Sequence, residues 1–207
     1  MKTPVDGTKS TRWDELCSIV KIVLEIGTIF DTNGVDLYFL NRPAFLRIKD
    51  PRDVERAFTN PPSGFTALAP ALRDILQLPA ARPGYDKKLL IFIATDGAPT
   101  DDNGDPDLAE FERVMREERK SDTTHVMFLL CTDDETCVNY LNEWDLTMKH
   151  VDVTDDFRTE REKVHRYRGS DYQFSLGDYI VKALIGAVDR QMDEINEPDR
   201  ANNDDDQ

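Results

Sequence analysis

A group of carboxylates follows the most apolar stretch of the chain. Asp96 comes directly after residues 89–94, a run of aliphatic and aromatic side chains without polar alternation. Such a run is typical of a central parallel strand that is covered on both faces, and the Asp-Gly pair that follows is typical of a turn. Because ligands of open α/β sheets bind at the carboxyl ends of such strands, Asp96 is the first candidate for a functional residue.

The loop after Asp96 carries four more carboxylates, which raises the question of a calcium loop: Asp101, Asp102, Asp105 and Asp107. In a calcium-binding loop of the EF-hand type, a glycine stands five residues after the first ligand. Gly97 and Gly104 would place Phe92 and Pro99 at that first position, and neither has a carboxylate. The spacing therefore favours a solvated acidic loop over a calcium site.

The residues around Asp96 were also compared with an enzyme motif. Thr95-Asp96-Gly97 resembles the Asp-x-Asp-Gly motif of the haloacid dehalogenase phosphatases, in which the first aspartate is the nucleophile. Ala94 stands at that position here. The three histidines are scattered, and no phosphate-binding glycine loop is present. We therefore expect that the chain is not an enzyme and takes no nucleotide cofactor, with a degenerate hydrolase that uses Asp96 as the alternative.

Composition narrows the possible partners and the compartment. The chain has 207 residues, enough for one well-cored domain, and a net charge of −15, which argues against nucleic acid and anionic membranes as partners. No apolar run approaches the roughly 20 residues of a membrane-spanning helix, and the first residues lack the apolar core of a secretory signal. The three cysteines are too few for a disulfide framework. We expect a cytoplasmic protein with reduced thiols.

The elements that must position Asp96 alternate along the chain. Apolar runs predict strands at residues 35–40, 45–48 (a short edge strand), 89–94, 124–131 and 150–154. Helical periodicity and capping residues predict helices at residues 11–26, 51–58, 67–76, 108–120, around 138–144 and 175–195. This alternation predicts an α/β fold with a mostly parallel sheet and helices on both faces. Residues 196–207 are acidic and contain no large apolar side chain, so we expect a disordered tail.

Three segments together resemble the von Willebrand factor A (vWA) domain family. They are residues 34–40 after a long first helix, Gly64-Phe-Thr66-Ala-Leu-Ala-Pro-Ala-Leu72, and Ile91-Phe-Ile-Ala-Thr-Asp96-Gly97-Ala-Pro-Thr-Asp101. The resemblance covers residues 1–195 and implies a three-layer, doubly wound, Rossmann-like sheet. It also implies a metal-ion-dependent adhesion site for Mg²⁺ or Mn²⁺, through which many members bind an acidic residue of a protein partner. Thr66 and Asp96 match two metal ligands of the family.

The family's first motif, Asp-x-Ser-x-Ser at the end of the first strand, is not in this sequence. We therefore expect an amino-terminal truncation that removes the central strand, which leaves a gap on the order of 10 Å or forces its neighbours to pair directly. Two ligands are too few for a cation that needs about six, so Mg²⁺ or Mn²⁺ should bind weakly or not at all. Thr66 could equally be a helix cap. The predicted function is a protein–protein interaction module with an incomplete metal site, its binding carried by the acidic loops.

Overall fold

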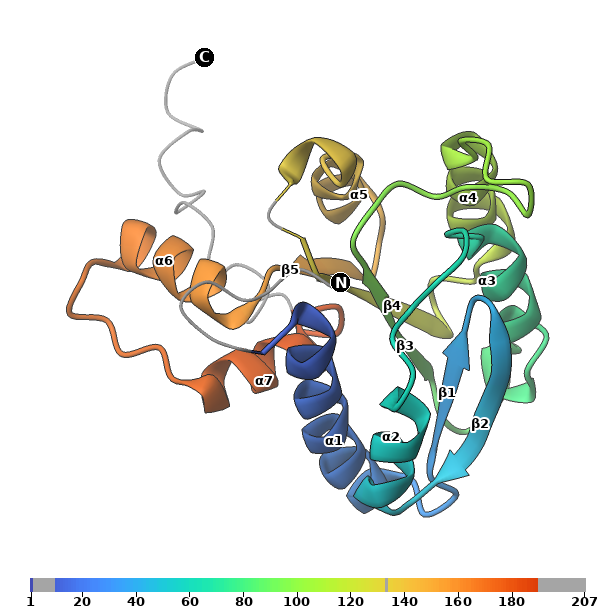
Figure 1. Ribbon diagram of the computed structural model, residues 1–207, viewed down its shortest axis with the longest axis horizontal. Coiled ribbons are helices and arrows are strands. Elements are labelled where there is room, and N and C mark those ends of the chain that lie inside the picture. Colours follow the sequence, from blue (N-terminus) through green and yellow to red (C-terminus); the bar gives the residue numbers. More distant parts are fainter. Residues whose placement is uncertain (2–9, 133, 190–207) are drawn as a thin grey trace.

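The computed structural model describes residues 1, 10–132 and 134–189 and has an α/β fold (Figure 1). Its main sheet is parallel, with the strand order β3 (Leu89–Thr95), β4 (Thr124–Leu130) and β5 (Val151–Thr154). All residues of β4 are buried because this strand is paired on both edges and covered on both faces. The prediction of an α/β fold that contains a parallel sheet is confirmed.

Helices cover both faces of this sheet, as predicted. Their bounds are α1 (Arg12–Phe30), α2 (Pro51–Phe58), α3 (Leu68–Leu76), α4 (Leu108–Arg113), α5 (Tyr140–Thr147), α6 (Phe157–Arg168) and α7 (Leu176–Ile185). Val126 and Phe128 of β4 pack against α3, α4 and α5, whereas Met127 and Leu129 pack against α1, α2 and α7. Because successive side chains of a strand point to opposite faces, β4 takes part in both apolar cores.

Two further strands form a separate hairpin. β1 (Val35–Phe39) pairs in antiparallel fashion with β2 (Arg42–Ile48). The hairpin packs against the first two helices through an aromatic cluster, in which the Phe39 ring centroid lies 6.3 Å from that of Trp13 and 6.0 Å from that of Phe58, and the Arg42 guanidinium lies 5.7 Å from the Trp13 ring. Trp13 also donates a hydrogen bond of 2.9 Å from Nε1 to the Phe58 carbonyl. These contacts fix the position of the hairpin.

One expectation about the sheet is wrong. Residues 89–94 have the pattern of a central strand, but β3 is at the edge of the three-stranded sheet. β1 and β3 belong to separate sheets, so of the two outcomes expected for a missing central strand the structure has the gap and not direct pairing of its neighbours. Of the seven residues of β3, only Ile91 and Thr95 are buried. The physical reason is that β3 pairs with β4 on one edge, while none of the described segments pairs with its other edge.

The helices differ from the prediction in smaller ways. The sequence reading missed α6, which is highly polar and buries only Glu160 and Val164. The final helix, α7, ends at Ile185, and residues 186–189 are not helical. The rest of the predicted helix, residues 190–195, and the predicted tail lie outside the described residues. The three cysteines form no disulfide bond. Within the described ranges no helix has both the length and the apolar character that a membrane crossing demands.

Candidate functional site

A large groove lies between β1 and β3, with a volume of about 1260 Å³. This exceeds the roughly 300–1,000 Å³ of most small-molecule pockets. Its walls include Leu16 and Val20 of α1, Leu37 of β1, Phe92 of β3 and Ile75 of α3, so that most of its surface is apolar. The groove therefore separates the hairpin from the three-stranded sheet and gives access to apolar side chains of both.

The two strands that flank the groove run in the same direction. Before the strands begin, Lys87 Nζ forms an ion pair of 3.4 Å with Asp31 Oδ1. Beyond their ends, Gly64 lies against the side chain of Asn41, and the Thr66 N–H donates a hydrogen bond of 2.9 Å to Thr100 Oγ1. Because the segments before both strands meet at one end and the segments after both meet at the other, β1 and β3 are parallel.

The backbone of β3 presents hydrogen-bonding groups to the groove. The Leu89 N–H donates to the Thr123 carbonyl, and the Thr95 carbonyl accepts from the Cys131 N–H, both at 2.8 Å. Since backbone groups of a strand alternate between its two edges, Leu90, Phe92 and Ala94 direct their N–H and C=O groups away from β4. On the opposite side of the groove, β1 forms a ladder with β2 and with no other described strand.

Thr66 and Asp96 both line this groove: Asp96 directly follows the end of β3, and Thr66 precedes α3. The Asp96 side chain is 41% exposed, and its Oδ2 is in ion-pair contact with the amine of Met1. Thr66 is half-buried, and its carbonyl accepts from the Thr100 N–H at 2.9 Å. The alternative that Thr66 caps the next helix is wrong, because Ala67 is the capping residue of α3 and makes no side-chain capping bond.

The donors near Asp96 do not fit a Mg²⁺ or Mn²⁺ site. Thr66 and Asp96 supply two side-chain groups, whereas such a cation takes about six oxygen ligands. In the parts of the chain that the structure describes, no three His, Cys, Asp or Glu side chains come together to hold a metal. Asp101 instead accepts hydrogen bonds from the backbone N–H groups of Asn103 and Asp105, at 2.8 and 2.9 Å. The bond from Asp105 is the main cause of the lowered pKa of Asp101, which marks this carboxylate as a turn residue.

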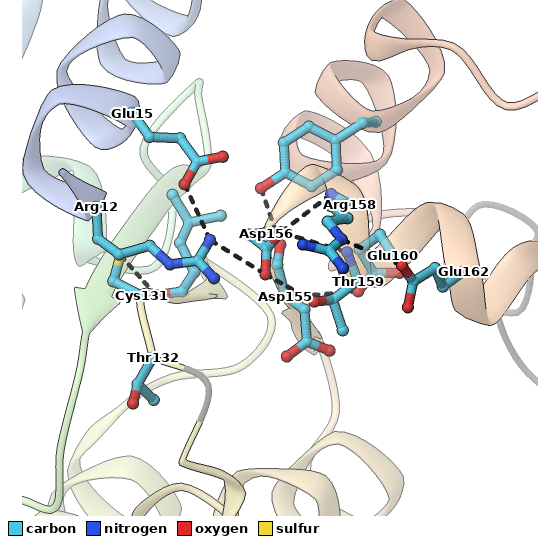
Figure 2. A network of polar contacts seen from close by, with 12 residues as sticks. Arg12, Glu15, Cys131, Thr132, Asp155, Asp156, Arg158, Thr159, Glu160 and Glu162 are labelled. Carbon is cyan, nitrogen blue, oxygen red and sulfur yellow. Dashed lines mark hydrogen bonds and ion pairs between the residues drawn. The ribbon is translucent and has the colours of Figure 1, made fainter. Parts of the chain in front are cut away.

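A second polar cluster, at the ends of β4 and β5, was not found from the sequence (Figure 2). Arg12 Nη1 forms ion pairs with Asp156 Oδ2 at 3.2 Å and with Glu15 Oε2 at 3.1 Å. Asp156 in turn accepts from the Arg158 N–H at 3.0 Å and from Thr159 Oγ1 at 2.7 Å, and so caps α6. This cluster joins the start of α1 to the start of α6. A carboxylate two residues after a strand and three residues before a threonine was the available signal.

A buried thiol lies beside this second cluster. Burial raises the pKa of Cys131 to about 12, so that the thiol stays protonated at neutral pH and is a poor nucleophile. Figure 2 places Cys131 next to Arg12, whose ion pairs are already made with carboxylates. The cluster therefore has a structural explanation, whereas the groove presents unpaired backbone and apolar walls. No family model, no curated protein and no solved structure matches this chain.

Proposed function

We propose that the chain is a protein–protein interaction module of the vWA type and that the groove between β1 and β3 is its binding site. The observation that carries this proposal is the groove itself, which ends at Thr66 and Asp96 and is larger than most small-molecule pockets. Its apolar walls and open strand edges offer the kind of surface on which protein segments dock.

The charge of the module favours a basic partner. The net charge is −15, and the carboxylate of Asp96 is exposed at the end of the groove. Charge complementarity of this kind speeds association and suppresses acidic partners. Because two side-chain groups are too few for a divalent cation, we propose binding that does not depend on Mg²⁺ or Mn²⁺.

The proposal is tested by selecting random displayed peptides on the immobilised chain. We expect enrichment of peptides that bind equally in Mg²⁺ and in a chelator. Ala94→Phe should weaken their binding by at least about tenfold, because the added ring fills the groove that Ala94 lines. Ala109→Phe, the same change at an exposed position of α4, is the matched control and should leave binding unchanged.

Two outcomes would contradict the proposal. Selection that enriches no peptide above the bare support would remove the evidence for a peptide-binding site. Enriched peptides that bind Ala94→Phe as well as the unchanged chain would place binding elsewhere.

A further inference from the structure

We propose that the groove binds one extended segment of a partner protein as a β-strand, inserted between β1 and β3 and parallel to both. This inference rests on the proposed function and specifies the form of the partner. The inserted strand would join the hairpin and the three-stranded sheet into one sheet with the order β2, β1, partner strand, β3, β4, β5.

Unpaired backbone groups select a polypeptide over other apolar ligands. Leu90, Phe92 and Ala94 direct N–H and C=O groups to the groove, where apolar side chains surround them. A lipid tail would bury these groups without partners, and each unpaired group is costly. An inserted strand pairs with both neighbours, because its own backbone groups alternate between its two edges.

The groove also sets the length and side-chain pattern of the strand. The flanking strands have five and seven residues, so the inserted segment pairs over about six residues, or roughly 20 Å. One face of the groove belongs to the core that contains Leu16 and Phe92, and the other to the core that contains Ile75 and Ile91. Both faces of the inserted strand are therefore apolar, as in a central strand.

Charges at the two ends fix the direction. A parallel strand begins beside Lys87 and Lys88, both exposed, and ends beside Asp96. The Asp96 carboxylate is in ion-pair contact with the amine of Met1, which the cation of the incoming strand would replace. The segment that fits has an acidic residue before its apolar run and a lysine or arginine after it, which also suits the net charge of −15.

A synthetic peptide provides the direct test. The probe is a fluorescein-labelled peptide with the order Glu-Gly, about six alternating valines and isoleucines, and Gly-Lys-Lys, a length set by the flanking strands. Its binding to the chain is followed by fluorescence anisotropy. Two N-methylated versions block alternate amides, one version for each edge of the strand. We expect each version to bind at least about tenfold more weakly, since each loses its pairing with one neighbouring strand. The same residues in reverse order should also bind more weakly.

Changes in the protein give an independent readout. Leu90→Pro removes an N–H that points into the groove, at an edge where proline is compatible with a strand. We expect this variant to lose at least about tenfold in affinity for the unmethylated probe. A circular dichroism spectrum like that of the unchanged chain shows that the variant is folded. If the variant does not fold, the methylated peptides still test the inference on the unchanged chain.

Several results would overturn the inference. Equal binding of the methylated and unmethylated peptides would show apolar adsorption without strand pairing, and loss with only one methylated version would show pairing with a single edge. Displacement of the probe by a fatty acid at equal concentration would assign the groove to a lipid. If displayed peptides bind in the groove but tolerate methylation at every position, the proposed function stands and the strand insertion fails.

Discussion

β3 and β4 are neighbouring strands of equal length and similar apolar composition, yet their surroundings differ. All seven residues of β4 are buried, whereas β3 buries two. β4 has a strand on each side, and β3 has one on one side and the groove on the other. The comparison shows that the apolar side chains of a strand indicate that its two faces are covered. They do not indicate whether another strand pairs with each edge, because that pairing uses backbone groups.

A proline in each strand tests the comparison most severely. Val126→Pro removes the N–H that donates to the His150 carbonyl at 3.0 Å in the middle of the sheet, and we expect the chain not to fold. Leu90→Pro removes an N–H that faces the groove, and we expect a folded protein. Circular dichroism and urea unfolding check both. If both variants are equally unfolded, the outer edge of β3 is paired in the folded protein and is not open.

Truncation of one phenylalanine in each strand should give the next largest effect. Phe128 is fully buried and packs near Phe111 and Trp144, so Phe128→Ala should lower the free energy of unfolding by about 3–5 kcal/mol. Phe92 is half-buried beside the groove, and Phe92→Ala should cost less than half as much. Urea denaturation measures both values. Equal losses would mean that β3 is as well covered as β4.

The free energy of unfolding should fall in acid because of a buried histidine of β4. His125, the register partner of Leu90, is buried and stacks on His150 with ring centroids 4.0 Å apart. Burial is the main reason that the pKa of His125 falls to about 4. A folded-state pKa below the unfolded value of 6.5 means that the neutral ring is favoured by folding. Its contribution is thus complete above about pH 6.5 and is lost as the pH falls toward 4.

We expect this loss to reach up to about 3 kcal/mol between those pH values. Urea unfolding across that range measures it. The control is His125→Phe, which keeps an aromatic ring on His150 but cannot be protonated, and which should flatten this part of the pH dependence. An unchanged slope in the variant would show that other groups are responsible, such as His150, whose pKa is also lowered by burial.

Hydrogen exchange should give the smallest effect, confined to single amides. The amides of Leu90, Phe92 and Ala94 should exchange on the order of a hundredfold faster than those of Leu89 and its alternate neighbours, because the latter bond to β4. NMR of the labelled chain resolves them. In β4 no such alternation should appear, and uniform protection along β3 would contradict an open edge.

Much of the fold could be predicted because several signals agreed locally. The bounds of α2 were right, since Asp50 caps the helix and Pro51 occupies its first turn. α6 was missed because its buried face is small and includes the charged Glu160, which weakens the apolar periodicity. β2 begins at Arg42, before the predicted start at residue 45, because its outer edge has no described partner and therefore tolerates Pro43.

The candidate site was predicted in part. Asp96 directly follows β3, as its position after an apolar run predicts, and it lines the groove together with Thr66, which precedes α3. The pair of Arg12 and Asp156 could not be predicted, since its residues come from opposite ends of the chain and meet only after the sheet has formed. The groove, in contrast, lies between β1 and β3, where the resemblance to the vWA family implies a gap on the order of 10 Å left by a missing strand.

The aromatic cluster around Trp13 has a kinetic consequence. It fastens the hairpin to α1 and α2, so that the spacing of β1 from β3 is set before the proposed partner strand arrives. A binding site that is already open requires no rearrangement of the protein, and association can then approach the ordinary protein–peptide range of about 10⁵–10⁷ M⁻¹s⁻¹. The slow step is the straightening of the incoming segment, and weakening the cluster would turn a preformed receptor into one that must assemble at each encounter.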